Sequence, residues 1–182
     1  MTTVTVMPRE SRDWTVDDLD LLPDDGLQYE LLDGLLLVTP APIPVHQRAA
    51  ARMHLLLAAA CTSQFEVFFA PLDWRPDIRT SLQPDLLVVA KDRVGAENIT
   101  EPLALAVEVL SPSTRRKDMV LKRSKYEDAG VVSYWIVDPV VPSFVAYDLV
   151  AGRYVEVARA SGSDSAEVTL PFPARVVPST LV

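Results

Sequence analysis

Two acidic side chains occupy positions where ionised groups are expensive. Glu108 interrupts the apolar run 105–110, "LAVEVL", and Asp85 follows Pro84 at the start of a second run, "LLVVA". A buried ionised group is unfavourable unless it is paired or bound to a cation. If the two runs form neighbouring strands, the carboxylates converge and need a cation or a shared proton. Mg²⁺ and Mn²⁺ take oxygen ligands of this kind, so Asp85 and Glu108 are a candidate metal site.

A lysine is expected to face the same region. The pattern predicts a helix from about Lys117 to Ala129, followed by Gly130 as its C-terminal cap. Spacings of three and four residues place one stripe of this helix against the sheet: Met119, Lys122, Tyr126 and Ala129. A lysine turned toward a sheet must reach an anion or extend to water, and Glu108 is the nearest anion by connectivity. Acids that hold a metal, with a lysine that orients water or stabilises the phosphorane charge, suit phosphodiester cleavage.

Each of these residues also has a simpler interpretation. Glu108 shares a strand face with Ala104 and Ala106, and alanine tolerates exposure, so this face of the strand can be solvated. Asp85 can be a turn residue after its proline. Lys122 and Glu108 can form a buried ion pair that only fixes packing, although desolvating both ions costs several kcal/mol. The spacing alone leaves these alternatives open.

The elements that must position these residues are predicted from periodicity and turn signals. Asp33-Gly34 favours a tight turn between antiparallel strands, and Ala151-Gly152 joins a second hairpin. Thr15 is a helix N-cap, and Pro23 ends that helix. Helices are expected over 15–23 and 44–63, and strands over 27–32, 35–40, 65–70, 86–90, 103–110, 133–138, 143–149 and 153–160, with a short edge strand at 167–170.

The order of these elements indicates the fold class. A helix joins strands 103–110 and 133–138, so these two strands can lie parallel, whereas the hairpins are antiparallel. We therefore expect an α/β (α+β) fold, a mixed β-sheet flanked by helices. The chain has 182 residues, of which 49% are hydrophobic, and this length favours a single domain over 1–182.

Charge is unevenly distributed along the chain. The net charge is -8, and residues 1–40 hold nine acids against Arg9 and Arg12. Residues 115–125 instead hold six basic residues against Asp118. This segment either forms a solvated loop or contacts the phosphates of a nucleic acid, which positions a duplex without reading its sequence. The candidate phosphate contacts are Arg115, Arg116, Lys117, Arg123 and Lys125.

Other classes of site and location are disfavoured. Cys61 is the only cysteine, so neither an intrachain disulfide nor a thiolate zinc cluster is possible. His46 and His54 are eight residues apart and do not share a helix face, and His46 is expected in a cap or packing role, with a cleft-facing role as the alternative. No apolar run approaches the length of a membrane span, and the N-terminus lacks the order of a secretory signal, so we expect a cytoplasmic protein.

Four segments resemble a large prokaryotic family of small proteins known as putative restriction endonucleases, within the PD-(D/E)XK nuclease superfamily. They are "YELLDGLLLV", "QPDLLVV", "VEVLSPST" and "KDMVLKRSKYEDAGVVSYWIVDP", and the resemblance covers roughly residues 15–148. It implies a restriction-endonuclease-like core over about 27–148, and the turn signals add a C-terminal hairpin and tail over 143–182. It also implies that Asp85 and Glu108 bind metal and that Glu30 is the upstream acid.

The sequence departs from the superfamily pattern at the lysine. Leu110 stands two residues after Glu108, at the position of the motif lysine. The family that the chain resembles shows the same departure, with the lysine displaced to the following helix at the position of Lys122. Lys122 is also the lysine that the helical spacing turns toward the sheet.

The principal hypothesis is an Mg²⁺-dependent endonuclease that hydrolyses DNA. We expect a homodimer, because two symmetric copies most simply cut the two strands of a duplex. The alternative is a nuclease-fold binding or accessory protein, weak or inactive in catalysis, that keeps the same residues as a structural ion network. A glycosidase, a third possibility, has little support from an aromatic content of 7%.

Overall fold

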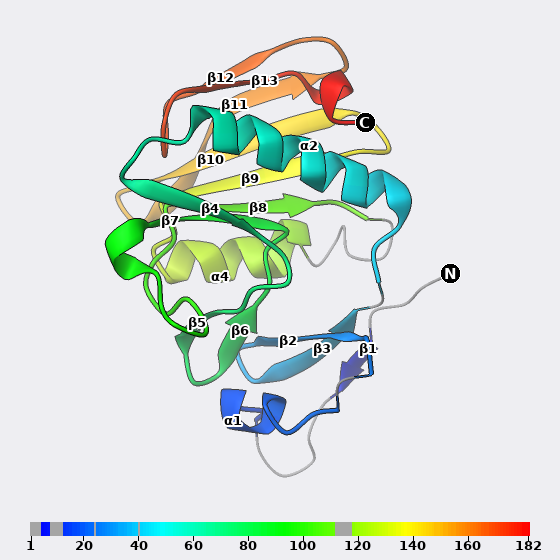
Figure 1. Ribbon diagram of the computed structural model, residues 1–182, viewed down its shortest axis with the longest axis vertical. Helices are drawn as coiled ribbons and strands as arrows, with labels where there is room; N and C mark the ends of the chain where they lie inside the picture. Colours follow the sequence, from blue (N-terminus) through cyan, green and yellow to red (C-terminus); the bar gives the residue numbers. More distant parts are fainter. Residues whose placement is uncertain (1–4, 8–12, 24, 40, 112–117) are drawn as a thin grey trace.

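A six-stranded mixed sheet forms the centre of the computed structural model, which describes residues 5–7, 13–23, 25–39, 41–111 and 118–182 (Figure 1). Its strand order is β11-β10-β9-β8-β7-β4. Strands β8 and β9 are parallel, as predicted, and the other neighbours are antiparallel. The strands are β4 (Phe65–Phe69), β7 (Leu86–Ala90), β8 (Leu105–Val109), β9 (Ser133–Asp138), β10 (Ser143–Val150) and β11 (Arg153–Ser161).

A smaller five-stranded sheet has the order β1-β3-β2-β6-β5. The predicted hairpin supplies β2 and β3, and Asp33 (φ 50°) and Gly34 (φ 85°) make the left-handed turn that such a hairpin requires. Strands β1, β5 and β6 were not predicted, because segments of three or four residues show no clear alternation. The strands are β1 (Thr5–Met7), β2 (Gln28–Leu32), β3 (Leu35–Thr39), β5 (Trp74–Asp77) and β6 (Thr80–Leu82).

Two helical segments cover opposite faces of the six-stranded sheet (Figure 1). Helix α2 (Pro44–Ala60) packs on one face, and the other face is covered by a π-helical turn, η2 (Asp118–Lys122), that leads into α4 (Arg123–Asp128). Gly130 ends α4 with φ 77°, as predicted. Its amide donates to Glu127 O, and the Val131 amide donates to Tyr126 O, which satisfies the last carbonyls of the helix.

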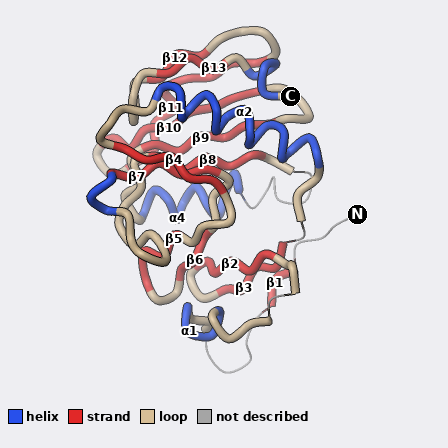
Figure 2. The backbone as a smooth tube through the Cα atoms, in the orientation of Figure 1, coloured by secondary structure: helices blue, strands red, loops and turns tan. Residues whose placement is uncertain are grey.

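The remaining elements are short (Figure 2). Helix α1 (Val16–Leu19) begins after Thr15 but ends well before Pro23, so it is shorter than predicted. The predicted edge strand is β12 (Ala166–Val168), and it pairs with an unpredicted β13 (Ala174–Val176). The described residues also include two 3₁₀ turns, η1 (Lys91–Arg93) after β7 and η3 (Pro178–Leu181) near the C-terminus. No helix in the described segments is long and apolar enough to cross a membrane.

Strand alternation sends side chains of the central sheet into two cores. On β8, Leu105 and Val107 pack toward α2, whereas Ala106 packs toward α4 and the smaller sheet. Glu108 follows Ala106 on the same side and is only 2% exposed. The face of Glu108 is therefore covered, which excludes the solvated interpretation. The α+β arrangement with a mixed sheet is confirmed.

Candidate active site

The antiparallel pairing of β7 and β8 brings Asp85 and Glu108 together. Leu86 pairs with Val107, so continuing the register by one residue places Asp85 opposite Glu108. The Val109 amide donates a hydrogen bond of 2.7 Å to Asp85 Oδ2, which holds this carboxylate against the end of β8. Asp85, directly before β7, is thus held at the end of β8 that carries Glu108.

Lys122 lies between two carboxylates from different sheets. Its Nζ is 3.0 Å from Glu108 Oε1 on the six-stranded sheet and 2.8 Å from Glu30 Oε1 on the five-stranded sheet. The exposed fractions are 4% for Lys122, 2% for Glu108 and 5% for Glu30. The lysine therefore connects the two sheets within the protein interior.

Tyr126 belongs to this site, although the sequence predicted only a packing role for it. Its hydroxyl donates a hydrogen bond of 2.7 Å to Glu108 Oε1. Burial, together with the negative charge of Glu108, raises the pKa of Tyr126 well above its ordinary value, so the hydroxyl stays protonated and remains a donor. Its spacing of four residues from Lys122 could have indicated this role, because it places both side chains on the same face of the helix.

Two further residues hold the acids from outside. The backbone N–H of Gln83 donates to Glu30 Oε1 at 3.0 Å, and His46 Nε2 lies 3.3 Å from Asp85 Oδ2. His46 is in the first turn of α2 and is 8% exposed. It is therefore both a buried packing residue and a contact of the site. Gln83 was missed, although it directly precedes the Pro84-Asp85 pair in the sequence.

The basic residues expected to contact phosphate divide into three cases. Lys125 Nζ lies 2.7 Å from Asp33 Oδ1 and 2.8 Å from Asp77 Oδ2, partners that the sequence did not predict. Its side chain is 12% exposed, so it is not on an open, wet face. The Arg123 guanidinium stacks over the Tyr147 ring at 4.2 Å. Three others lie outside the described residues: Arg115, Arg116 and Lys117.

The carboxylates of the site were compared with the ligand sets that metal ions require. Within residues 5–7, 13–23, 25–39, 41–111 and 118–182, no group of three or more His, Cys, Asp or Glu side chains could hold a metal ion. A closed protein cage of the zinc or calcium kind is therefore not formed by these residues. Mg²⁺ instead uses one or two carboxylates and completes its shell with water and substrate phosphate, a requirement that Asp85 and Glu108 fit.

Comparison with known proteins assigns the family. The family model Uma2, described as "Putative restriction endonuclease", matches residues 16–179. The chain belongs to this family. A crystal structure described as a putative nuclease belonging to DUF820, from Anabaena variabilis, has a TM-score of 0.72 and 18% sequence identity over 86% of this chain and 89% of that chain. No curated protein matches the chain.

The Uma2 assignment confirms the resemblance found in the sequence. The structural match, at 18% identity, establishes the fold and leaves the roles of individual residues open. The roles of individual residues in this Uma2 protein stay predictions.

Proposed function

We propose that this protein is an Mg²⁺-dependent endonuclease that hydrolyses phosphodiester bonds of DNA. The observation that carries the proposal is the buried Lys122 between Glu30 and Glu108, beside Asp85. Asp85 and Glu108 would hold the ion, which when bound supplies an activated water and neutralises charge on the scissile phosphate. The family assignment supports a nuclease.

Lys122 and the residues around the acids supply the other functions of the site. Lys122 orients the attacking water or stabilises the phosphorane with its ammonium group, and Glu30 holds that group from the opposite side. Glu30 in turn accepts a hydrogen bond from the backbone N–H of Gln83, and Asp85 accepts one from the backbone N–H of Val109. These hydrogen bonds fix the acids before substrate arrives, which is the property that a preorganised site requires.

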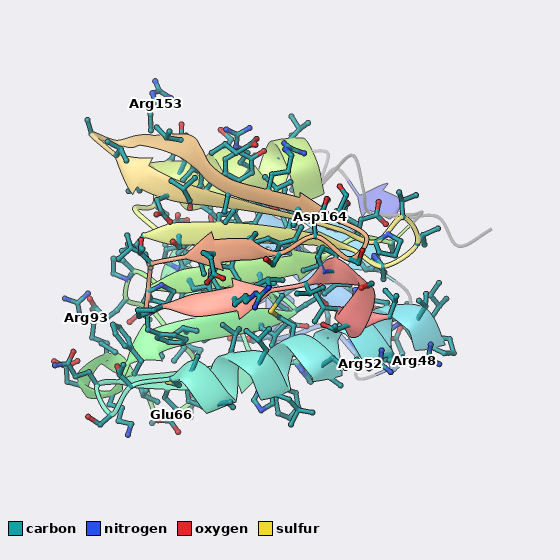
Figure 3. The ribbon with its side chains drawn as sticks, turned by 90° about the horizontal axis from the view of Figure 1, so that it is seen from above. Arg48, Arg52, Glu66, Arg93, Arg153 and Asp164 are labelled. Atoms are coloured by element: carbon teal, nitrogen blue, oxygen red, sulfur yellow. The ribbon has the colours of Figure 1, made fainter. Side chains whose placement is uncertain are left out.

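The decisive test is metal-dependent nicking of supercoiled plasmid by the pure protein. Asp85→Asn keeps an oxygen that can accept the Val109 amide but removes the charge that holds the ion. Metal assistance contributes several kcal/mol, so we expect the nicking rate to fall about 100-fold or more. The matched control is Asp164→Asn, in an exposed turn between β11 and β12 that is labelled in Figure 3, and it should nick like wild type.

Equal nicking by wild type and Asp85→Asn would refute the proposed mechanism. Cleavage of an RNA duplex but not of plasmid would instead retain the site and correct the substrate. The homodimer is part of the same proposal. Analytical ultracentrifugation should give twice the mass of one chain, and a monomer that only nicks single strands would contradict it.

A second candidate function is supported by the same buried ion network. A lysine shared between two carboxylates can serve packing alone, in a binding or accessory protein without catalysis. In that case calorimetry would detect no Mg²⁺ or Mn²⁺ binding. Stability would also rise when Lys122 and Glu108 are both replaced by apolar residues of similar volume.

A further inference from the structure

The Glu108 carboxylate receives two donors from one helical segment. Lys122 Nζ lies 3.0 Å from Glu108 Oε1, and the Tyr126 hydroxyl donates to the same oxygen at 2.7 Å. The donors are four residues apart, so they lie one turn apart on the same side of the segment. Lys122 also contacts Glu30, so its ammonium is shared between two carboxylates. The Tyr126 hydroxyl has a single proton to donate, and it donates this proton to Glu108.

Tyr126 is the rigid member of this pair of donors. The side chain is fully buried, with its ring 5.4 Å from the ring of Trp74 and 5.2 Å from the ring of Tyr134. Both neighbours are themselves fully buried, so the packed core fixes where the hydroxyl stands. A lysine ammonium sits on a flexible four-carbon chain and cannot impose an orientation in the same way.

We infer that Tyr126 is a positioning residue of the proposed nuclease site: its hydroxyl fixes the Glu108 carboxylate in the orientation that binds the metal. The inference rests on the proposed function. Carboxylates that bind a metal are held by outer hydrogen bonds, and loss of such a partner typically weakens metal binding by about 10- to 100-fold. Tyr126 is fully buried, so it would act through Glu108 and not by contact with the substrate.

The test compares Tyr126→Phe with a matched tyrosine variant. Tyr154→Phe also removes one buried hydroxyl hydrogen bond, that from Tyr154 to Val131 O at 2.9 Å, but this bond lies outside the acid cluster. Calorimetric titration with Mn²⁺ in the absence of DNA should show about tenfold or more weaker binding by Tyr126→Phe and unchanged binding by Tyr154→Phe. In plasmid cleavage, Tyr126→Phe should lower kcat and leave the KM for DNA unchanged.

The outcomes separate this inference from the proposed function. If wild type binds no Mn²⁺, the proposed function is wrong and the inference falls with it. If wild type binds Mn²⁺ and Tyr126→Phe binds it within twofold as tightly, only the inference is wrong. Equal weakening by both tyrosine variants would also overturn it, because that result reflects general loss of packing.

A second measurement covers the case in which Tyr126→Phe does not fold. Crystals of wild-type protein soaked in Mn²⁺ should show the Tyr126 hydroxyl still hydrogen-bonded to the Glu108 carboxylate while the ion is bound. A Glu108 side chain that turns away from Tyr126 in the loaded site would overturn the inference.

Discussion

At the scale of single residues, two lysines three positions apart have different environments. Lys122 is almost fully buried between Glu30 and Glu108. Lys125 contacts Asp33 and Asp77, whose side chains are 63% and 43% exposed. A buried charge needs its partners far more than a charge near water does. Loss of Lys122 should therefore destabilise the protein more than loss of Lys125.

We expect Lys122→Met to reduce the free energy of unfolding by about 3–5 kcal/mol, because it leaves two buried carboxylates without their shared ammonium. Lys125→Met should reduce it by about 1 kcal/mol or less, because its partners remain hydrated. Urea denaturation of the three proteins at pH 7 measures both changes. Equal destabilisation by the two substitutions would show that the Lys122 network is not desolvated in solution.

At the scale of elements, two hairpin turns use the same left-handed backbone with different residues. In the β2–β3 turn the first position is Asp33 (φ 50°), and in the β10–β11 turn it is Ala151 (φ 50°). Alanine pays a steric penalty in this region, whereas Asn and Asp tolerate it. The β10–β11 turn is therefore strained, and a substitution at Ala151 can relieve the strain.

Ala151→Asn is expected to raise the free energy of unfolding by roughly 0.5–1 kcal/mol, since Asn-Gly is the preferred pair for this turn. The same change at Ala59, an exposed position of α2, should instead lower stability, because Asn is a poorer helix former than Ala. Thermal melts of both variants provide the comparison. A lower melting temperature for Ala151→Asn would contradict the argument.

At the scale of the whole molecule, the segment η2–α4 joins the two sheets (Figure 1). Lys122 reaches Glu30 on β2, and Lys125 reaches Asp77 at the end of β5. Burial by itself raises the pKa of Asp77, but hydrogen bonds from Lys125 and the Arg79 amide outweigh it, so this pKa lies below its ordinary value. A depressed pKa makes this connection sensitive to acid.

The contribution of Asp77 should be present above its unfolded pKa of about 3.9 and lost as the pH falls through the lower folded value. Wild type should therefore exceed Asp77→Asn in stability by a constant amount between pH 7 and about pH 5, and the difference should shrink below about pH 4. Urea denaturation at several pH values measures it. In a Lys125→Met background the pH dependence should be weaker, and an unchanged dependence would exclude Lys125 as its cause.

Local patterns determined much of the fold. Periodicity gave α2 and the strands of the central sheet, Asp33-Gly34 gave the first hairpin, and Gly130 gave the end of α4, because each depends on neighbours within a few residues. The short strands β5 and β6 were missed because long-range contacts hold them. Strand β6 pairs with β2, which is distant in the sequence, β5 pairs with β6, and Trp74 of β5 is buried in the core. Short strands of this kind carry little local signal.

By itself the sequence determined the residue types of the candidate site and their approximate placement: an acid before one buried strand, an acid within the next, and a lysine on the helix face turned toward them. Only the tertiary structure decided their partners. The β7–β8 pairing brought Asp85 to the Val109 amide beside Glu108, and the docking of the second sheet brought Glu30 to Lys122. The packed core turned Tyr126 into a hydrogen-bond donor to Glu108, because a hydroxyl buried there has to be satisfied.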